Sequence, residues 1–385
     1  MEDLSHSSLF VHLSSLEDPR SGENSKYNIT EVLFIAVCSV LAGCESWYQM
    51  EDFGEAKSDW LSSFLDLKNG TPSHDTFRRV FTLLDFESFQ EVFTTWTAEV
   101  KRALKIKTPD QICIDGKTLR GSVNKSKALR PLHMVHAWSL EASLNLGQVC
   151  TDEKSNEITA IPKLLNMLNI EGCLVSIDAM GCQREIADQI ISKGGDFLFA
   201  VKGNQAGLQE VTKETFRRHS KNAALPFSKS SYQDSETSHG RRNKRNCTAL
   251  SLKDDETAHL FVEADWPEVK TLIRIKSDRL VLSSGEKSKE VRYYVSSAIL
   301  SAEEACAKVR SHWEVENKLH WCLDVAMAED KDQKWARESA KNFALLRQFA
   351  LNLLRKFPDK KKRSIKRKKT MAAIDSNYLM QIWLQ

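Results

Sequence analysis

Three acidic residues, far apart in the chain, have the types and positions needed for metal-assisted chemistry. Asp115 ends the apolar stretch 111–114, and Asp178 ends another at 174–177. Glu316 lies far downstream, in a segment that reads as a helix. Mg²⁺ prefers carboxylate oxygens, and a pair of such ions stabilises both the attacking and the leaving oxygen of a phosphodiester. The trio therefore predicts a site for two Mg²⁺ (or Mn²⁺) ions and an enzyme that cuts and joins DNA.

The middle of the chain predicts the elements that would bring the first two acids together. From residue 110 onward the pattern reads β-β-β-α-β-α-β. This is the order of an RNase H-like fold, in which the first and fourth strands lie side by side. Asp115 and Asp178 would then be neighbours although 63 positions separate them (178 − 115). The predicted strands cover 111–115, 133–140, 145–151, 173–178 and 196–201, and the predicted helices cover about 159–168 and 183–193.

The whole chain predicts an α/β protein with three parts. An all-helical N-terminal domain would cover residues 1–105, with a first helix that Asn28 or Thr30 could cap. A catalytic domain would cover 106–355 and would contain a β-rich insertion at about 206–300. A basic tail would cover 356–385. Finer expectations are strand-like pieces at 260–262 and 291–295, helices at about 301–325 and 335–354, and a flexible segment at 360–369.

Bulk composition excludes some classes of protein. The net charge of +3 does not by itself indicate a nucleic-acid binder, and 41% hydrophobic residues are ordinary for a globular chain. The nine cysteines include no CxxC pair, which argues against a zinc ribbon or a disulfide framework and fits a reducing cytoplasm. The apolar run 33–42 is too short to span a bilayer, so we expect a buried helix and no membrane partner.

Each acid also has an ordinary interpretation. Asp115-Gly116 after a strand is often only a turn, and Asp178 could simply cap the helix that follows. Glu316 competes with Glu314, Glu329 and Asp330. Of these, Glu314 would point roughly 200° away from Glu316 at about 100° per residue.

The segment around Glu316 allows a second kind of metal site. His312, Glu316 and His320 recur every four residues and would share one face of a helix. Two histidines and a glutamate could bind one ion, but the spacing is not HExxH, so a zinc protease is a weak hypothesis. Trp313 and Trp321 are expected to be core contacts of the same helix.

Cationic and amide side chains near the acids are candidate DNA contacts. Lys117 and Arg120 follow Asp115, and Lys202, Asn204 and Gln205 leave the last strand at the edge where ligands bind in open α/β sheets. Such groups suit phosphates and base edges. A polar loop is the alternative for 202–205.

Two further basic segments could reach DNA. Residues 73–81 predict a short helix with Phe77, Val80 and Phe81 in a core and with Arg78 and Arg79 facing outward. That helix could be the recognition helix of a helix-turn-helix, or part of a packed bundle with solvated arginines. The basic tail would attract DNA without reading its sequence, unless it is only a solvated tail.

Longer motifs carry a resemblance to a known family. They are Asp18-Pro19-Arg20, residues 72–77, Asp115-Gly116-Lys117, residues 154–162, residues 178–183, residues 202–205, residues 238–241 and residues 312–325. Together they resemble the DDE transposases of bacterial insertion sequences, specifically the H-repeat-associated subgroup, over nearly the whole chain.

The resemblance implies an activity and a set of partners. Asp115, Asp178 and Glu316 would be the catalytic, metal-binding acids. They would support hydrolysis at the terminal inverted repeats of an insertion sequence, and then attack of the freed 3′-hydroxyl on target DNA. The helical N-terminal domain would help to bind the ends, at least a dimer would hold two of them, and the protein would work at the bacterial nucleoid.

One departure from related transposase groups affects the phosphate contacts. Those groups carry Tyr and Arg before the glutamate and Lys after it, where this chain has Val309, His312 and Leu323. His312 and His320 are therefore candidate replacements. Two other functions stay open: a DNA-binding relic without chemistry, and a metal-dependent phosphodiesterase for small esters, against which the basic segments argue.

Overall fold

The computed structural model describes most of the chain. The described residues are 7–20, 25–106, 109–123, 130–151, 157–221, 227–238, 240–252, 265–332, 334 and 336–385. Residues 154–156 of one motif, His239 of another and the strand expected at 260–262 lie outside them.

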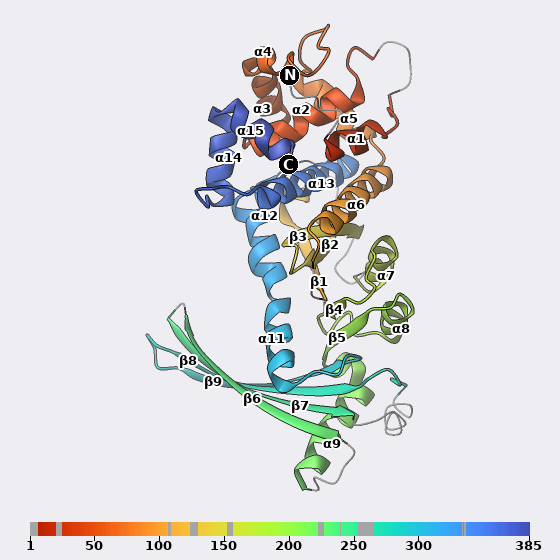
Figure 1. Cartoon of the computed structure of the whole chain (residues 1–385), viewed down its shortest axis with the longest axis vertical. Coiled ribbons are helices and arrows are strands. Elements are labelled where there is room, and N and C mark those ends of the chain that lie inside the picture. The colour runs from red at the N-terminus through yellow and green to blue at the C-terminus, as the bar shows by residue number, and fades with distance from the viewer. Residues whose placement is uncertain are drawn as a thin grey trace.

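One mixed sheet runs through the described chain (Figure 1). Its nine strands lie in the order β3-β2-β1-β4-β5-β9-β8-β7-β6. β1 is parallel to β4, and β4 to β5, whereas the other pairs are antiparallel. The strands are β1 Gln111–Leu119, β2 Leu132–Ser139, β3 Leu144–Thr151, β4 Leu174–Ile177, β5 Asp196–Val201, β6 Phe227–Ser238, β7 Arg241–Leu252, β8 Thr271–Val281 and β9 Lys287–Ser296.

The pairing of β1 with β4 confirms that the first and fourth strands are neighbours, with Ile114 opposite Ile177. The prediction that β1 ends at Asp115 was wrong. β1 continues to Leu119, because β2 pairs with it along its whole length. Asp115 therefore lies inside a strand, and Asp178 directly follows one.

The six N-terminal helices, α1 to α6, gather at one end of the molecule (Figure 1). They are α1 Ser8–Ser14, α2 Ile29–Leu41, α3 Trp47–Ala56, α4 Ser58–Leu61, α5 His74–Leu83 and α6 Phe86–Ala103. As predicted, Asn28 caps α2, in a capping box with Glu31, and α2 is buried almost throughout. Of these helices, α2, α5 and α6 pack on α13 (Arg337–Lys356), and the N-terminal helices share one hydrophobic core with the sheet.

Helices cover both faces of the catalytic part of the sheet. α7 (Glu157–Met167) and α8 (Arg184–Ser192) lie on one side, and α11 (Ala302–His312) and α12 (Trp321–Val325) lie on the other (Figure 1). Between α11 and α12 runs η7 (Val315–His320), a π-helical turn.

The π-helical turn corrects two expectations about the segment around Glu316. The helix predicted across 301–325 is interrupted, and the single stripe of His312, Glu316 and His320 is broken. His320 is buried beside Asp115, whereas Glu316 is exposed. Turns of this kind occur often at functional sites.

Residues 206–296 begin with α9 (Ala206–Lys221) and then form β6 to β9, which extend the sheet as a long arm (Figure 1). α11 packs on β6, β7 and β8 through a small core that includes Cys247, Ile275 and Ala305.

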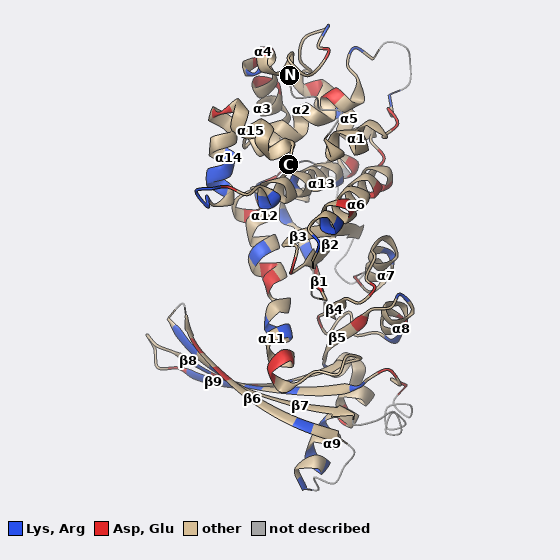
Figure 2. Ribbon diagram, viewed as in Figure 1, with Lys and Arg blue, Asp and Glu red and all other residues tan. Residues whose placement is uncertain are grey.

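The prediction of a flexible segment at 360–369 was wrong from residue 365 onward. α14 (Ile365–Ile374) and α15 (Ser376–Trp383) are folded against the N-terminal helices. Lys368 is buried, and its ammonium donates to the carbonyl oxygens of Leu354 at 2.6 Å and Phe357 at 2.7 Å. The exposed cations of this region are Lys360, Lys361, Lys362, Lys366 and Arg367 (Figure 2).

Among the described residues, no helix is both long enough and apolar enough to cross a membrane.

Candidate active site

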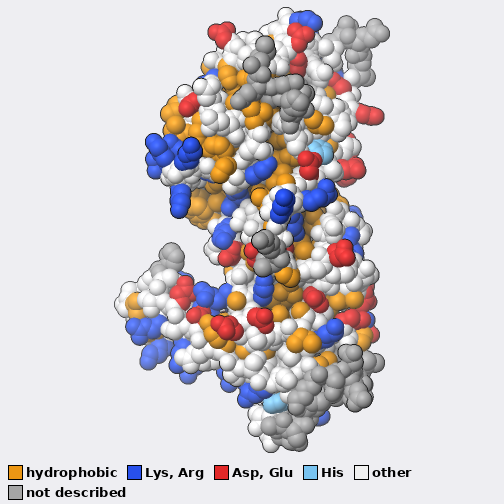
Figure 3. Space-filling model, in the orientation of Figure 1, with side chains coloured by type: hydrophobic (Ala, Val, Ile, Leu, Met, Phe, Trp, Pro, Cys, Tyr) orange, Lys and Arg blue, Asp and Glu red, His pale blue; other side chains and the backbone are white. Residues whose placement is uncertain are grey.

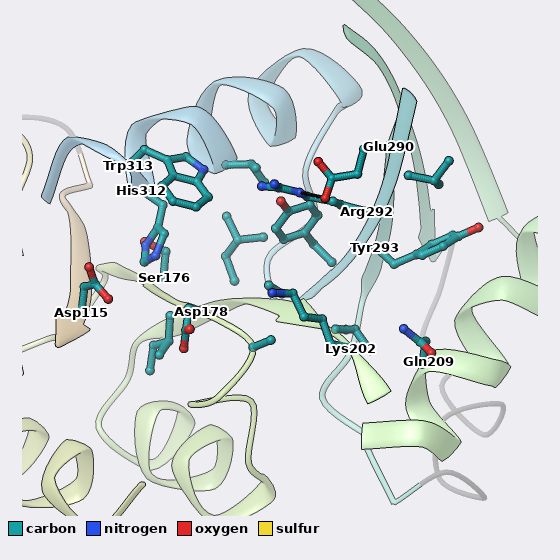
Figure 4. A pocket seen from close by; sticks show the side chains of 18 of the residues that line it. Asp115, Ser176, Asp178, Lys202, Gln209, Glu290, Arg292, Tyr293, His312 and Trp313 are labelled. Carbon is teal, nitrogen blue, oxygen red and sulfur yellow. Dashed lines mark hydrogen bonds and ion pairs between the residues drawn. The ribbon is translucent and has the colours of Figure 1, made fainter. Parts of the chain in front are cut away.

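The three predicted acids line one cavity of about 330 Å³. Asp115 comes from β1, Asp178 from the turn after β4, and Glu316 from the π-helical turn η7. Figure 4 shows Asp115 and Asp178 at one end of this cavity and Glu290 with Arg292 toward the other. The cavity therefore joins chain segments that are about 200 residues apart.

The environment of Asp115 is strongly negative. Its side chain is 21% exposed. Burial raises the pKa of Asp115 to about 7, and the charges of Glu316 and then Asp178 push it in the same direction, against a backbone hydrogen bond from Gly116. Carboxylates that repel each other in this way need a cation if all are to be ionised at neutral pH.

Asp178 has a local structural role as well. One of its oxygens, Oδ1, accepts hydrogen bonds from the backbone N–H groups of Met180 at 3.0 Å and Gly181 at 3.4 Å. The carboxylate thus shapes the turn that holds it at the cavity.

Asn204 and Gln205, predicted to contact DNA, brace that same turn. The amide of Asn204 donates to the carbonyl of Ala179 at 2.6 Å, and the amide of Gln205 donates to the carbonyl of Cys182 at 3.0 Å. Lys202, just before them, is exposed and lines the cavity.

The two histidines are poor replacements for the missing cationic phosphate contacts. Burial lowers the pKa of His312 to about 4 and that of His320 to about 3, so both are neutral at pH 7. His312 shares a hydrogen bond of 3.0 Å with the hydroxyl of Ser176, and His320 lies 3.7 Å from the carboxylate of Asp115. His312 lines the cavity and His320 does not, and neither supplies a cation there at pH 7.

Lys117 is also not a surface cation. Its side chain is 7% exposed, and its ammonium lies 2.7 Å from both Asp324 and Glu329 and 3.4 Å from Asp330. Burial alone would lower the pKa of Lys117, but Glu329 and Asp324 together raise it to about 12. The predicted phosphate contact of Lys117 is therefore incompatible with this position. The side chain instead ties β1 to the segment after Glu316.

The arginines predicted to contact DNA are exposed. Arg120 is 81% exposed and lies 3.6 Å from Asp330. Arg78 and Arg79 face outward from α5 and line a surface hollow, while Phe77, Val80 and Phe81 are buried as predicted.

α3 and α5 do not form a helix-turn-helix. Residues 57–73, which include the short helix α4, separate them, whereas that motif joins its helices by a turn of about 3–4 residues. α5 instead packs in a helical bundle with α2, α3 and α13, and the DNA contact of its exposed arginines stays a prediction.

Three cavity residues were missed or misassigned from the sequence. Trp313, expected in the core, is 42% exposed and lies beneath the guanidinium of Arg292, 5.6 Å from the ring centre. Arg292 is in turn held by Glu290 at 2.7 Å. Trp321, also expected in the core, is 58% exposed. A helical repeat could not reveal the exposure of Trp321, because the π-helical turn rotates the residues after it.

The donor chemistry of the cavity suits a divalent cation. Three carboxylates line it, and burial together with repulsion from the other two raises the pKa of Asp115. Within the described residues, however, no three acidic, histidine or cysteine side chains lie close enough to hold an ion as they stand. The residues fit a hard cation by type and charge, and binding would have to draw the carboxylates together.

Comparison with known families decides the ancestry of the site. The family model described as "Transposase DDE domain" matches residues 106–353, and the model described as "DDE_Tnp_1-associated" matches residues 10–97. The chain belongs to the DDE transposase family. It is a DNA transposase, as the resemblance in its motifs predicted.

Relatives of this transposase match it along almost its full length. The "H repeat-associated putative transposase YhhI" of Escherichia coli (strain K12) is 41% identical over 377 residues, which cover 97% of each chain. The "Putative transposase YncI" of Escherichia coli O157:H7 is 38% identical over 98% of this chain and 95% of its own. These matches confirm the predicted resemblance to the H-repeat-associated subgroup.

Two matches are more distant or partial. A chain of the piggyBac transposase synaptic complex with hairpin DNA aligns with 100% of this transposase and with 78% of its own length, at 12% identity and a TM-score of 0.38. The "Inactive transposase YbfQ" of Escherichia coli (strain K12) is 38% identical over 19% of this chain and 86% of its own.

Proposed function

We propose that this transposase is catalytically competent: it hydrolyses phosphodiesters at the ends of an insertion sequence and joins the freed 3′-hydroxyl to target DNA. The observation that carries the proposal is the convergence of Asp115, Asp178 and Glu316 on one cavity. All three acids of the family signature are present, and they come from the elements expected of an RNase H-like core. The strand order β3-β2-β1-β4-β5 supports that assignment.

Asp115, Asp178 and Glu316 would hold two Mg²⁺ or Mn²⁺ ions. Bound there, the ions would stabilise charge on the attacking and leaving oxygens of the phosphodiester. The raised pKa of Asp115 supports this role, because a cation removes the repulsion that keeps the carboxyl protonated.

The protein groups around the acids would position the DNA. Lys202 and Arg292 line the same cavity and would attract the backbone toward it. His312 and Ser176, which are hydrogen-bonded to each other, would hold the wall between Asp178 and η7. Asn204 and Gln205 would keep the Asp178 turn in place. No covalent enzyme intermediate is needed.

The other parts of the chain would serve the same reaction. We propose that residues 1–105 help to bind the terminal inverted repeats, with Arg78 and Arg79 exposed for backbone contacts, and that Arg120 contributes beside the cavity. The exposed cations of 356–385 would add non-specific affinity for duplex DNA on the nucleoid. Two ends would require at least a dimer.

The test is cleavage of a supercoiled plasmid that carries the element ends, in the presence of Mg²⁺. Glu316→Gln should abolish nicking and strand transfer but leave DNA binding intact. Glu314→Gln is the matched control, because Glu314 lies two residues away and pairs with Lys318 at 2.5 Å on the surface. Equal loss in both variants would remove Glu316 from the catalytic set. No nicking by the parent with either metal would indicate a DNA-binding relic.

A further inference from the structure

The outer part of the sheet arm carries different charges on its two faces. Strands β6 to β9 pair in continuous antiparallel register. Successive side chains in a strand point to opposite sides, so the register assigns each residue to the face toward α11 or to the opposite face.

On the face toward α11, where Arg241 and Arg279 also lie, each of the acids Asp234, Glu236 and Glu290 is paired with an arginine. Arg310 of α11 lies 2.8 Å from Asp234 and 2.7 Å from Glu236, and Arg245 lies 3.1 Å from Asp234. On β9, Arg292 pairs with Glu290. These charges hold α11 and the arm together.

The opposite face has five cations and one carboxylate over three neighbouring rows. The register places Arg242 and Lys287 on either side of Leu280, and Lys244 and Lys289 on either side of Asp278. Lys276 belongs to the next row, between Asn246 and Val291. We call the surface formed by Arg242, Lys244, Lys276, Lys287 and Lys289 the outer cationic face.

All five side chains of the outer cationic face are exposed. In the part of the chain that the structure describes, none of them forms an ion pair. The face therefore has a local charge of +4 (five minus one), although the whole chain has only +3. Figure 2 marks lysine and arginine positions along the ribbon of the arm, and Figure 3 shows such side chains gathered on its outer part.

α9 covers another part of this side of the arm. α9 packs against β9, Arg274 lies 4.7 Å from the ring centre of Phe216, and Phe216 lies 6.0 Å from the ring of Tyr293. The outer cationic face begins where this packing ends. Five exposed like charges on one flat sheet repel each other, and a polyanion would relieve that repulsion.

We propose that the outer cationic face binds the phosphate backbone of a DNA duplex, and that this duplex is not the one held at the catalytic cavity of the same subunit. The proposal rests on the proposed function. Neighbouring strands are about 4.8 Å apart and alternate residues about 7 Å apart, so the cations form a grid that several phosphates can meet at once. Duplex DNA fits this grid better than a compact anion does.

The direction of the outer cationic face separates the two duplexes. The catalytic cavity is lined by α11, by η7, by Gln209 and Lys213 of α9 and by residues 290–294 of β9. None of the five cations of the outer cationic face is among its lining residues. The outer cationic face points away from α11, to the other side of the sheet. A duplex bound there would have to bend around the arm to enter the same cavity, and such sharp bending of DNA is costly.

The test loads the full-length protein with a short duplex that carries an element end, and then titrates a second, labelled duplex of mixed sequence at several salt concentrations. The outer-face variant is Lys244→Gln, Lys276→Gln and Lys289→Gln. The control variant is Lys163→Gln, Lys193→Gln and Lys331→Gln, which removes the same charge from surface lysines outside the arm, outside residues 1–105 and outside the basic tail. Each lost phosphate contact reduces the salt slope by about 0.9.

For the second duplex, we expect the slope of log K against log salt to be less steep by about 2 to 3 in the outer-face variant than in the parent. We also expect the variant to bind this duplex at least tenfold more weakly at low salt. It should still cut the first duplex, and the control variant should keep the parental slope. Identical slopes for the two variants would overturn the proposal and would leave an acidic protein surface as the partner of this face. If the parent neither binds nor cuts the first duplex, the proposed function fails instead.

Discussion

Repulsion among Asp115, Asp178 and Glu316, together with the burial of Asp115, should make the metal-free protein less stable at neutral pH than a variant without Asp115. In the folded chain the pKa of Asp115 rises from 3.8 to about 7, through burial and the charges of Glu316 and Asp178. The folded state therefore keeps a proton that the unfolded chain has lost. Because the folded state binds more protons between these two pKa values, the free energy of unfolding falls as pH rises through this window.

The size of the effect follows from the pKa change. One unit of pKa is worth about 1.36 kcal/mol, so a rise from 3.8 to about 7 corresponds to at most about 4 kcal/mol above pH 7. The side chain is 21% exposed and shares its repulsion with Glu316, so we halve this value. Asp115→Asn should then raise the stability of the metal-free protein by about 2 kcal/mol at about pH 8, and by almost nothing at about pH 4.

The assay is urea unfolding of parent and variant with a chelator present, repeated across this pH range. Mg²⁺ should stabilise the parent, more strongly at high pH where protons no longer compete, and should have little effect on the variant. Asp59→Asn, which removes an exposed carboxyl on α4, is the control and should show no pH-dependent difference. A stability difference for Asp115→Asn that is absent, or that does not change with pH, would refute the reasoning.

Three other predictions concern the packing around the site. Lys117→Met should destabilise the fold by about 3–5 kcal/mol in urea unfolding, because it leaves the carboxylates around Lys117 without their buried cation; a change below about 1 kcal/mol would contradict the role of that ion pair. Gly116→Ala should lower thermal stability by about 1–3 kcal/mol, because a Cβ there would lie 2.3 Å from His133 and 2.4 Å from Glu157; an unchanged melting temperature would contradict this close contact. Deletion of residues 365–385 should yield unfolded or aggregated protein, because it exposes the core under the buried Trp383, and a soluble, cooperatively folded product in thermal unfolding would contradict it.

The strands of the central sheet were predictable because their signals are local. Alternating and continuous apolar runs marked β1 to β5 within a few residues, and a polar residue before an apolar helix marked the cap at Asn28. The neighbourhood of β1 and β4 followed from the order of the elements. That topology was enough to predict that Asp115 and Asp178 lie near each other.

The π-helical turn was not predictable in the same way. It depends on how η7 packs against β1, and a repeat of 3.6 residues assumes that no such turn exists. The exposure of Trp321 and the burial of His320 follow from it.

The sequence by itself determined the family, the three acids and the order of the strands that join the first two. Only the tertiary structure decided which charged side chains are free to meet DNA. Lys117 and Lys368 look like solvated cations in the sequence, yet one is neutralised by Glu329, 212 positions away, and the other donates to backbone carbonyls. The physical reason is that the charge of a lysine is a property of the residue, whereas its availability depends on partners that only the folded chain brings within reach.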